Sequence, residues 1–321
     1  MTTIIKHTEI LSVVKDIDII AEMEKGFIEY SNGNVIVPPV GELLFDEPKG
    51  EAHIKYGYIK KDDSYCIKIA SGFYDNPKLG IASCQGMMLL FNQKTGQPQA
   101  ILLDNGLLTD LRTAAAGALT AKYFAPKNIQ AIGIIGTGVQ AKLQLQYLQK
   151  YISNKKVWLW GRTTDNALKF KSELAEFDIN IAASPAELAA RCNLIVTATS
   201  SESPLLFSDD INPGTHITAI GSDTPEKNEL DNKLLCKADL LISDSIAQSK
   251  SRGEIYQAIK NHAISMDKVK ELGSLIQSTF AQHLGSNNIS IVDLTGVAVQ
   301  DIVLAKAVYK RVINKRKQDD A

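Results

Sequence analysis

The sequence predicts an α/β protein in which a parallel-sheet domain is inserted into a split α+β domain, and three observations support this. Residues 35–103 hold short segments rich in aromatic and branched side chains, a pattern typical of an antiparallel sheet. From Gln130 onward, apolar strands alternate with helices, which indicates a parallel sheet covered on both faces. One strong helical pattern precedes this change and another ends the chain.

The first part of the chain predicts helix, sheet and helix in that order. A helix is expected over Thr8–Tyr30, where Thr8 can cap the first turn and the apolar residues share one face. The sheet segments are "HIKYGYI", "SYCIKIAS", "GMMLLFN" and "QAILLD", with "NQKTGQP" as a hairpin turn. The segment "TDLRTAAAGALTAKYFA" then predicts a helix that ends at Pro126.

The second part predicts a parallel sheet. Its expected strands are "QAIGIIG", "KVWLWG", "INIAAS", "LIVTATS", "HITAIGS" and "DLLISDS", and one more strand follows before a long final helix. Residues 1–124 and 296–321 are therefore expected to form one domain and residues 125–295 the inserted one. A cleft between two such domains would be the natural ligand site.

Composition excludes several classes of protein. The formal net charge is −1, and no apolar run approaches the length of a membrane span. The four cysteines are scattered, and the five histidines lack metal-ligand spacing. We expect a cytoplasmic protein without a secretory signal, with reduced thiols, that binds no nucleic acid, membrane or metal.

The segment "IIGTGVQA" predicts a Rossmann dinucleotide-binding turn of the form G-x-G-x-x-A. Gly136 permits the tight turn, Gly138 lets the backbone approach a pyrophosphate, and Ala141 allows close packing of helix on strand. The start of the following helix presents free N–H groups to phosphates. The binding residues of this turn are expected to be Gly136, Thr137, Gly138, Val139 and Gln140. The alternative is a tight strand-to-helix turn with no ligand.

The end of the second strand of this unit indicates which dinucleotide is bound. An NAD site usually has an acidic residue there, which bonds the ribose 2′-hydroxyl. In this chain "VWLWG" is followed by Arg162 and Thr163, which can bind a 2′-phosphate. We therefore expect NADP(H) to be preferred and NAD(H) to be possible. The alternative for Arg162 is a surface side chain beside a helix cap.

Four segments together resemble the ornithine cyclodeaminase/mu-crystallin family: "LRTAAAGALTAKYFAP", "IIGTGVQA", "AIGSDTPEKNELD" and "DLTGVAVQDIVLAK". The resemblance covers essentially the whole chain. It implies a homodimer in which the split domain supplies the dimer contact and the substrate pocket, while the Rossmann domain carries a nicotinamide cofactor. The family includes ornithine cyclodeaminases, alanine dehydrogenases, ketimine reductases and crystallin-like binding proteins.

The resemblance also implies roles for individual residues. Arg112 matches the family arginine that binds the substrate carboxylate, as a planar guanidinium can. Lys68 matches a family lysine that bonds the carboxylate or stabilises charge at the reacting carbon. Asp223 matches an acid that exchanges a proton with the substrate nitrogen, directly or through water. The alternatives are a paired helix arginine, a solvated strand lysine and a turn aspartate.

Further residues have weaker assignments. Thr113, Thr197 and Ala198 are expected near the cofactor, although core and capping roles suit the two threonines nearly as well. Asp301 is expected to cap or pair at the final helix and is not assigned to catalysis. Many family members have an arginine where this chain has Asn34.

His53 and Lys55 share one face of a strand by the two-residue period, and either could bind substrate in place of that arginine. The alternative is that both are solvent-side residues of an amphipathic strand.

These features predict an NAD(P)H-dependent ketimine reductase that converts Δ1-pyrroline-2-carboxylate, a small cyclic imino acid, to L-proline. Δ1-Piperideine-2-carboxylate, which would give L-pipecolate, is a second candidate substrate. Many family members have an arginine where this chain has Asn34, and this difference weakens the case for an ornithine cyclodeaminase. That activity remains an alternative, together with alanine dehydrogenase and with an NADPH-binding protein that lacks catalysis.

Overall fold

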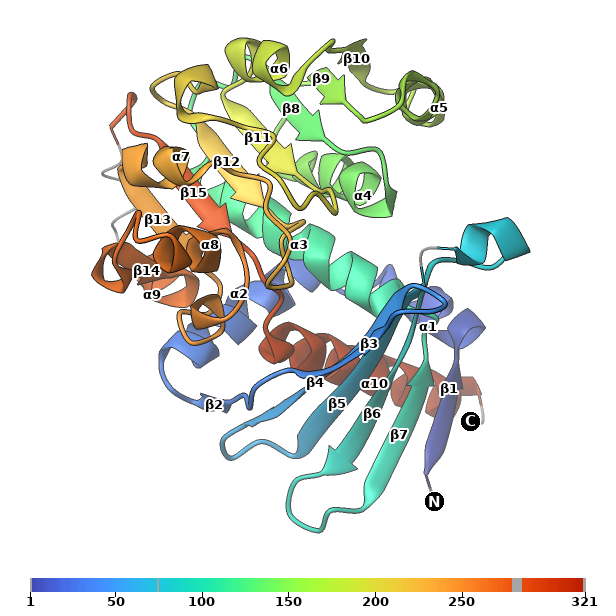
Figure 1. Ribbon diagram of the computed structural model, residues 1–321. Helices are drawn as coiled ribbons and strands as arrows, with labels where there is room; N and C mark the ends of the chain where they lie inside the picture. Colours follow the sequence, from blue (N-terminus) through green and yellow to red (C-terminus); the bar gives the residue numbers. More distant parts are fainter. Residues whose placement is uncertain (1, 74, 279–284, 320–321) are drawn as a thin grey trace. The chain divides into compact units, whose positions relative to one another are not determined.

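The computed structural model describes residues 2–73, 75–278 and 285–319. The chain forms two compact units: unit 1 is Met1–Arg112 with Val297–Ala321, and unit 2 is Thr113–Gly296 (Figure 1). The division falls within α3 (Leu107–Phe124), a helix that the sequence assigned as a whole to the first domain. Most of α3 therefore belongs to unit 2.

Unit 1 contains a mostly antiparallel sheet with the strand order β1-β7-β6-β5-β4-β2, and β3 pairs with β4. Its strands are β1 (Thr3–Lys6), β2 (Val35–Ile36), β3 (Gly41–Phe45), β4 (Gly50–Ile59), β5 (Ser64–Phe73), β6 (Cys84–Asn92) and β7 (Pro98–Leu103). Strand β1 was not predicted, and it pairs with β7 in parallel. The turn between β6 and β7 confirms the predicted hairpin.

The single helix predicted over Thr8–Tyr30 is wrong, because the chain forms two helices there. These are α1 (His7–Val14) and α2 (Ile19–Ser31). The Asp18 carboxylate accepts a hydrogen bond from the Ala21 N–H at 3.3 Å and so caps the start of α2. At α1, Glu9 accepts from the Lys6 N–H, and Thr8 is not the cap.

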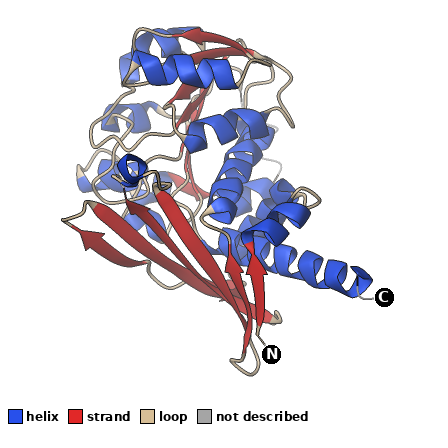
Figure 2. Ribbon diagram, turned by 90° about the vertical axis from the view of Figure 1, so that its right-hand side faces the viewer, coloured by secondary structure: helices blue, strands red, loops and turns tan. Residues whose placement is uncertain are grey.

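The two faces of this sheet differ in what covers them. Helix α10 (Ala298–Asp319) packs against β4, β5 and β6, and Figure 2 shows helices along one side of the long strands. We call the side under α10 the inner face. It buries apolar side chains such as Met88 and Leu90, but it also buries His53, Lys55 and Lys68. The polar residues of β4 and β5 thus point inward.

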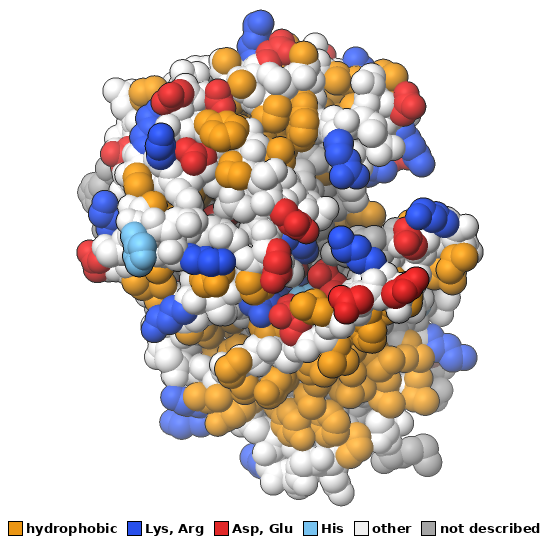
Figure 3. All heavy atoms as spheres, in the orientation of Figure 1, with side chains coloured by type: hydrophobic (Ala, Val, Ile, Leu, Met, Phe, Trp, Pro, Cys, Tyr) orange, Lys and Arg blue, Asp and Glu red, His pale blue; other side chains and the backbone are white. Residues whose placement is uncertain are grey.

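The opposite side, which we call the outer face, is apolar and exposed. Figure 3 shows hydrophobic side chains gathered over these strands. Eight of them are more than a third exposed: Ile4, Ile36, Leu43, Tyr56, Tyr58, Ile69, Met87 and Leu103. Soluble monomers rarely expose a continuous apolar patch of this kind.

Unit 2 is a Rossmann-type unit whose eight parallel strands have the order β10-β9-β8-β11-β12-β15-β13-β14. They are β8 (Ile132–Ile135), β9 (Lys156–Trp160), β10 (Asp178–Ile181), β11 (Leu194–Thr197), β12 (His216–Ala219), β13 (Leu240–Ser243), β14 (Val269–Glu271) and β15 (Ser290–Asp293). The helices are α4 (Val139–Leu148), α5 (Thr164–Glu173), α6 (Pro185–Arg191), α7 (Asn232–Lys237), α8 (Glu254–Lys260) and α9 (Leu272–Gln277).

The described residues also include four short 3₁₀ segments: η1 (Asn76–Leu79), η2 (Ser208–Asp210), η3 (Gln248–Lys250) and η4 (Met266–Lys268). No helix in the described part of the chain is long and apolar enough to cross a membrane. All four cysteines are free thiols.

The strand order of unit 2 locates its ligand edge. From β8 the chain runs outward to β9 and β10, and it then returns to β11 on the other side of β8. Open α/β sheets bind their ligands where the strand order reverses in this way, which here is at the carboxyl ends of β8 and β11.

Candidate functional site

The turn after β8 has the geometry of a dinucleotide-binding loop. Gly136 has a φ of +122°, and a Cβ there would lie 2.5 Å from the Ala198 carbonyl oxygen. A Cβ on Gly138 would meet nothing within 4 Å, while Ala141 is fully buried. Gly138 precedes the first turn of α4 and offers no capping side chain. The turn therefore leaves open space beside Gly138 at the start of α4, where a pyrophosphate can approach the backbone.

Arg162 and Thr163 follow the end of β9, and both are exposed. Thr163 is the N-cap residue of α5, but its hydroxyl makes no capping hydrogen bond. A Cβ on Gly161 would clash with the Thr137 side chain of the turn after β8. The end of β9 therefore lies against the dinucleotide turn, where the ribose of a bound cofactor is expected.

The other predicted cofactor residues contact β8, α4 or the loop after β12. The Thr113 carbonyl accepts a hydrogen bond from Gln144 of α4 at 3.0 Å. Ala198 follows β11, and its N–H donates to the Ile135 carbonyl at 2.8 Å. The Thr197 hydroxyl is buried and donates to Glu229 at 2.7 Å. The side chain of Thr197 therefore has the core role that the sequence left open.

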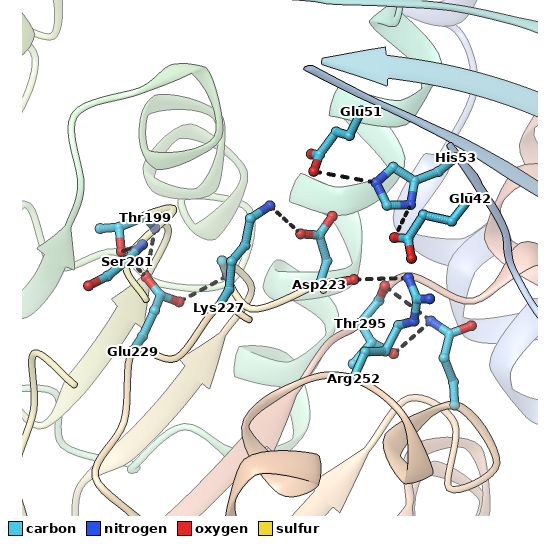
Figure 4. Close-up of polar contacts among 12 residues, drawn as sticks. Glu42, Glu51, His53, Thr199, Ser201, Asp223, Lys227, Glu229, Arg252 and Thr295 are labelled. Atoms are coloured by element: carbon cyan, nitrogen blue, oxygen red, sulfur yellow. Dashed lines mark hydrogen bonds and ion pairs between the residues drawn. The ribbon is translucent and has the colours of Figure 1, made fainter. Parts of the chain in front are cut away.

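Glu229 joins the ends of β11 and β12 at this edge. Its fully buried carboxylate accepts hydrogen bonds from the Thr199 N–H at 2.6 Å and from the Gly221 N–H at 2.9 Å (Figure 4). Because these donors belong to the loops after both strands, Glu229 fixes the two loops relative to each other. Sequence reasoning did not find this residue.

A second buried acid, Glu254, holds Glu229 in turn. Its carboxylate accepts from the Glu229 N–H at 2.7 Å and from the Leu230 N–H at 3.0 Å. Burial, together with the nearby charge of Glu229, raises the pKa of Glu254 to about 8. Asp293 lies next in this group, and burial raises its pKa as well. The group is electrostatically costly, and it makes the local loops rigid.

Asp223 lies in the loop after β12 and is partly exposed. Its Oδ1 is 2.7 Å from Lys227 Nζ, and its carbonyl accepts from Arg252 Nη1 at 3.1 Å (Figure 4). Gln257 of α8 donates to the Pro225 carbonyl of the same loop at 2.6 Å. The segment at the start of α8 thus holds the loop that carries Asp223.

In unit 1, Lys68 and Arg112 share one carboxylate. Lys68 Nζ lies 3.0 Å from Asp301 Oδ2, and Arg112 Nε lies 3.3 Å from Asp301 Oδ1. Gln300 accepts a further hydrogen bond from Arg112 Nη1 at 3.1 Å. All three charged side chains are buried. Burial lowers the pKa of Lys68, while the charge of Asp301 opposes this effect.

His53 and Lys55 are buried on the inner face, so the alternative that they are solvent-side residues is wrong. Lys55 lies opposite Lys68 in the register of β4 and β5. His53 Nδ1 is 3.3 Å from Glu42 Oε1, and its Nε2 is 3.7 Å from Glu51 Oε2 (Figure 4). The sheet thus brings His53, Lys55 and Lys68 to one buried face.

Asn34 lies elsewhere in unit 1. It is exposed, and its side chain donates to Glu29 of α2 at 2.7 Å. Many family members have an arginine at this position. The Asn34 side chain instead bonds Glu29 at the surface of unit 1. The expectation that Asp301 pairs at the final helix is confirmed, but its two partners, Lys68 and Arg112, were not foreseen.

The turn after β8 has the form that binds a dinucleotide, and several similar proteins are NAD(P)-dependent reductases, so this chain is a nicotinamide-dependent oxidoreductase. The family model described as the ornithine cyclodeaminase/mu-crystallin family matches residues 1–316. The chain therefore belongs to this family.

The proteins similar to this chain differ in the activity that their names give. An uncharacterized cyclodeaminase of Sinorhizobium fredii is 36% identical over 92% of this chain and 91% of its own length. An alanine dehydrogenase of Archaeoglobus fulgidus is 34% identical, covering 98% of this chain and 96% of its own. An iminosuccinate reductase of Paracoccus denitrificans is 34% identical over 84% of this chain and 85% of its own.

Solved structures agree with the fold. The Δ1-pyrroline-2-carboxylate reductase of Thermococcus litoralis, in complex with NADH and L-proline, matches with a TM-score of 0.89 and 25% identity over 98% of each chain. A dimeric archaeal alanine dehydrogenase with bound NAD matches with a TM-score of 0.86 and 30% identity, covering 98% of this chain and 97% of that one.

Proposed function

We propose that this protein is an NAD(P)H-dependent ketimine reductase that converts Δ1-pyrroline-2-carboxylate to L-proline, with Δ1-piperideine-2-carboxylate as a second substrate. The observation that carries the proposal is the buried pair Lys68 and Arg112, which shares the single carboxylate of Asp301. A buried cationic pair of this kind is suited to binding the carboxylate of a small imino acid. The similarity to the solved Δ1-pyrroline-2-carboxylate reductase of Thermococcus litoralis supports the choice of a substrate with a five-membered ring.

Each residue has a defined task in this reaction. Arg112 binds the substrate carboxylate through its planar guanidinium, and Lys68 neutralises the same group from the strand beside it. Lys55 and His53, on the same sheet face, line the pocket for the ring. Asp223, or a water that it orients, supplies the proton to the imine nitrogen. The nicotinamide cofactor, when bound, supplies the hydride.

NADP(H) is the proposed physiological cofactor, and NAD(H) is a weaker one. Arg162 stands exposed at the end of β9, where its guanidinium can pair with a 2′-phosphate. The turn formed by Gly136, Thr137, Gly138, Val139 and Gln140 is proposed to bind the pyrophosphate. Thr163, Thr113 and Ala198 are proposed to lie beside the bound nucleotide, and Thr197 to support them from the core.

We also propose a homodimer formed through the outer face of unit 1. The apolar side chains of this face resemble the core of an interface, and Tyr65 and Phe91 stack there with ring centroids 5.0 Å apart. The archaeal alanine dehydrogenase, which matches over the whole chain, is a dimer.

A comparison of three reactions tests the proposed activity. Purified protein is given Δ1-pyrroline-2-carboxylate with NADPH, pyruvate with ammonia and NADH, or L-ornithine with NAD. The proposal expects the first to be by far the fastest and to yield L-proline. A faster reaction of pyruvate would instead identify an alanine dehydrogenase, and ammonia release from ornithine would identify a cyclodeaminase.

A further inference from the structure

The cluster of Lys68, Arg112 and Asp301 has an unusual charge balance. Two cations and one carboxylate leave one net positive charge among three side chains that are 2%, 6% and 1% exposed. Buried charges are costly unless they are paired. The carboxylate of Asp301 is therefore the group that makes the burial of both cations tolerable.

We propose that Asp301 is a positioning residue, which keeps the Lys68 ammonium charged and aims both cations so that one positive charge is left for the substrate carboxylate. The inference rests on the proposed function, because it takes Lys68 and Arg112 as the ligands of that carboxylate. It gives Asp301 no contact with substrate.

The position of Asp301 on α10 suits this task. The helix begins at Ala298, so Asp301 lies in its first turn, where the helix dipole stabilises a negative charge. The preceding residue, Gln300, accepts a hydrogen bond from Arg112 Nη1, while Asp301 lies against Arg112 Nε. Two consecutive side chains of one helix thereby fix the plane of the guanidinium. The same carboxylate reaches Lys68 with its other oxygen.

The surroundings of Lys68 show why the charge of Asp301 matters. Lys68 is surrounded by Asp301 from α10, Arg112 from α3, Cys66 on its own strand, Lys55 across on β4 and Asp104 after β7. Burial lowers the pKa of Lys68 most, Asp301 raises it, and Arg112 lowers it. Removing the charge of Asp301 therefore moves the loss of the Lys68 proton to lower pH.

The experiment compares Asp301→Asn with a matched control, Asp62→Asn. Asp62 also forms an ion pair with α10, through Lys306, but it contacts neither Lys68 nor Arg112. Asp301→Asn is expected to raise KM for Δ1-pyrroline-2-carboxylate by about tenfold or more and to shift the alkaline limb of kcat/KM to lower pH. NADPH affinity should not change. The control should keep the wild-type KM and pH profile.

A double variant separates charge from structure. Arginine stays protonated throughout the accessible pH range. Lys68→Arg therefore removes the alkaline limb of the kcat/KM profile that depends on the lysine proton. Adding Asp301→Asn to Lys68→Arg should then leave the pH profile unshifted. If Asp301→Asn lowers Tm and the active fraction while KM and the pH profile stay at wild type, Asp301 is merely structural and the inference is wrong.

Calorimetry with pyrrole-2-carboxylate, an unreactive cyclic carboxylate, separates this inference from the proposed function. If the wild type reduces no ketimine yet binds this probe, and Asp301→Asn weakens the binding with a shift to lower pH, the positioning role stands and the proposed function fails. If the wild type turns over Δ1-pyrroline-2-carboxylate but probe binding is unchanged in Asp301→Asn, the positioning role fails. Absence of probe binding to the wild type also overturns the inference.

Discussion

Lys227 Nζ lies 2.7 Å from Asp223 Oδ1, so the acid proposed to serve the substrate nitrogen carries its own cation from the same loop. Lys227 is the more buried of the two, because 14% of its side chain is exposed against 40% for Asp223.

Asp223→Asn should lower kcat by about a hundredfold or more, because the amide can no longer exchange a proton with the imine nitrogen. Affinity for NADPH, measured by fluorescence titration, should stay unchanged. Asp209→Asn, at an exposed acid of the same unit, serves as the control and should keep wild-type kcat. A wild-type kcat in Asp223→Asn would remove Asp223 from the mechanism.

Arg162→Ala should change which cofactor is used. The loss of the guanidinium removes the partner of a 2′-phosphate, so the ratio of kcat/KM for NADPH over NADH should fall about tenfold or more. Steady-state rates with each cofactor measure this ratio. The control is Arg191→Ala, because Arg191 contacts the Trp158 ring away from the dinucleotide turn. An unchanged ratio would mean that Arg162 is only a surface residue.

Met87→Glu should dissociate the proposed homodimer, because it places a charge in the middle strands of the outer face. Sedimentation velocity should show a dimer for the wild type and a smaller species for the variant. Leu168→Glu changes a still more exposed apolar residue on α5 in unit 2 and should remain dimeric. A monomeric wild type, or a dimer that survives Met87→Glu, would contradict the assignment of this face.

Glu254→Gln should flatten the dependence of stability on pH. Burial raises the pKa of Glu254 to about 8, from about 4.3 in an unfolded chain. The folded protein holds this proton more tightly, so the contribution to stability is complete below about pH 4.3 and is lost as pH rises through about 8. An amide cannot ionise, and the fall in Tm across this range should shrink in the variant.

Tm should still fall somewhat with rising pH in Glu254→Gln, because burial also raises the pKa of Asp293. The variant should be less stable at every pH below the transition, because the Glu229 and Leu230 N–H groups donate to different oxygens of Glu254, and one of these becomes an NH₂ group that cannot accept. Glu226→Gln, at an exposed acid of the nearby loop, provides the control. A wild-type slope in Glu254→Gln would show that this carboxyl group does not titrate there.

The dinucleotide turn could be predicted from sequence because its requirements are local. Gly136 must adopt a positive φ, Gly138 must leave open space, and both needs are met by the residue type itself. The helix break before Asp18 was missed because apolar periodicity continues through it, while a short acidic side chain caps a new helix. Strand β1 was missed because four residues are too few to carry a pattern.

The buried charges could not be predicted from the sequence around them. Alternation along β4 shows that His53 and Lys55 share a face, but it does not say which face is buried when the other one is apolar. Asp301 lies more than two hundred positions from Lys68 along the chain, so their contact depends on the packing of α10 over the sheet. Glu229 and Glu254 are likewise paired only by the tertiary fold.

The central claim is that Lys68 and Arg112 bind the carboxylate of a cyclic ketimine during its reduction. The most direct test measures NADPH oxidation by the wild-type protein with Δ1-pyrroline-2-carboxylate and with Δ1-pyrroline, which lacks the carboxylate. If Lys68 and Arg112 bind the carboxylate, the first compound should be reduced rapidly to L-proline, and kcat/KM for the second should be about a hundredfold or more lower. Equal rates with both compounds, or no reduction of the acid, would contradict it.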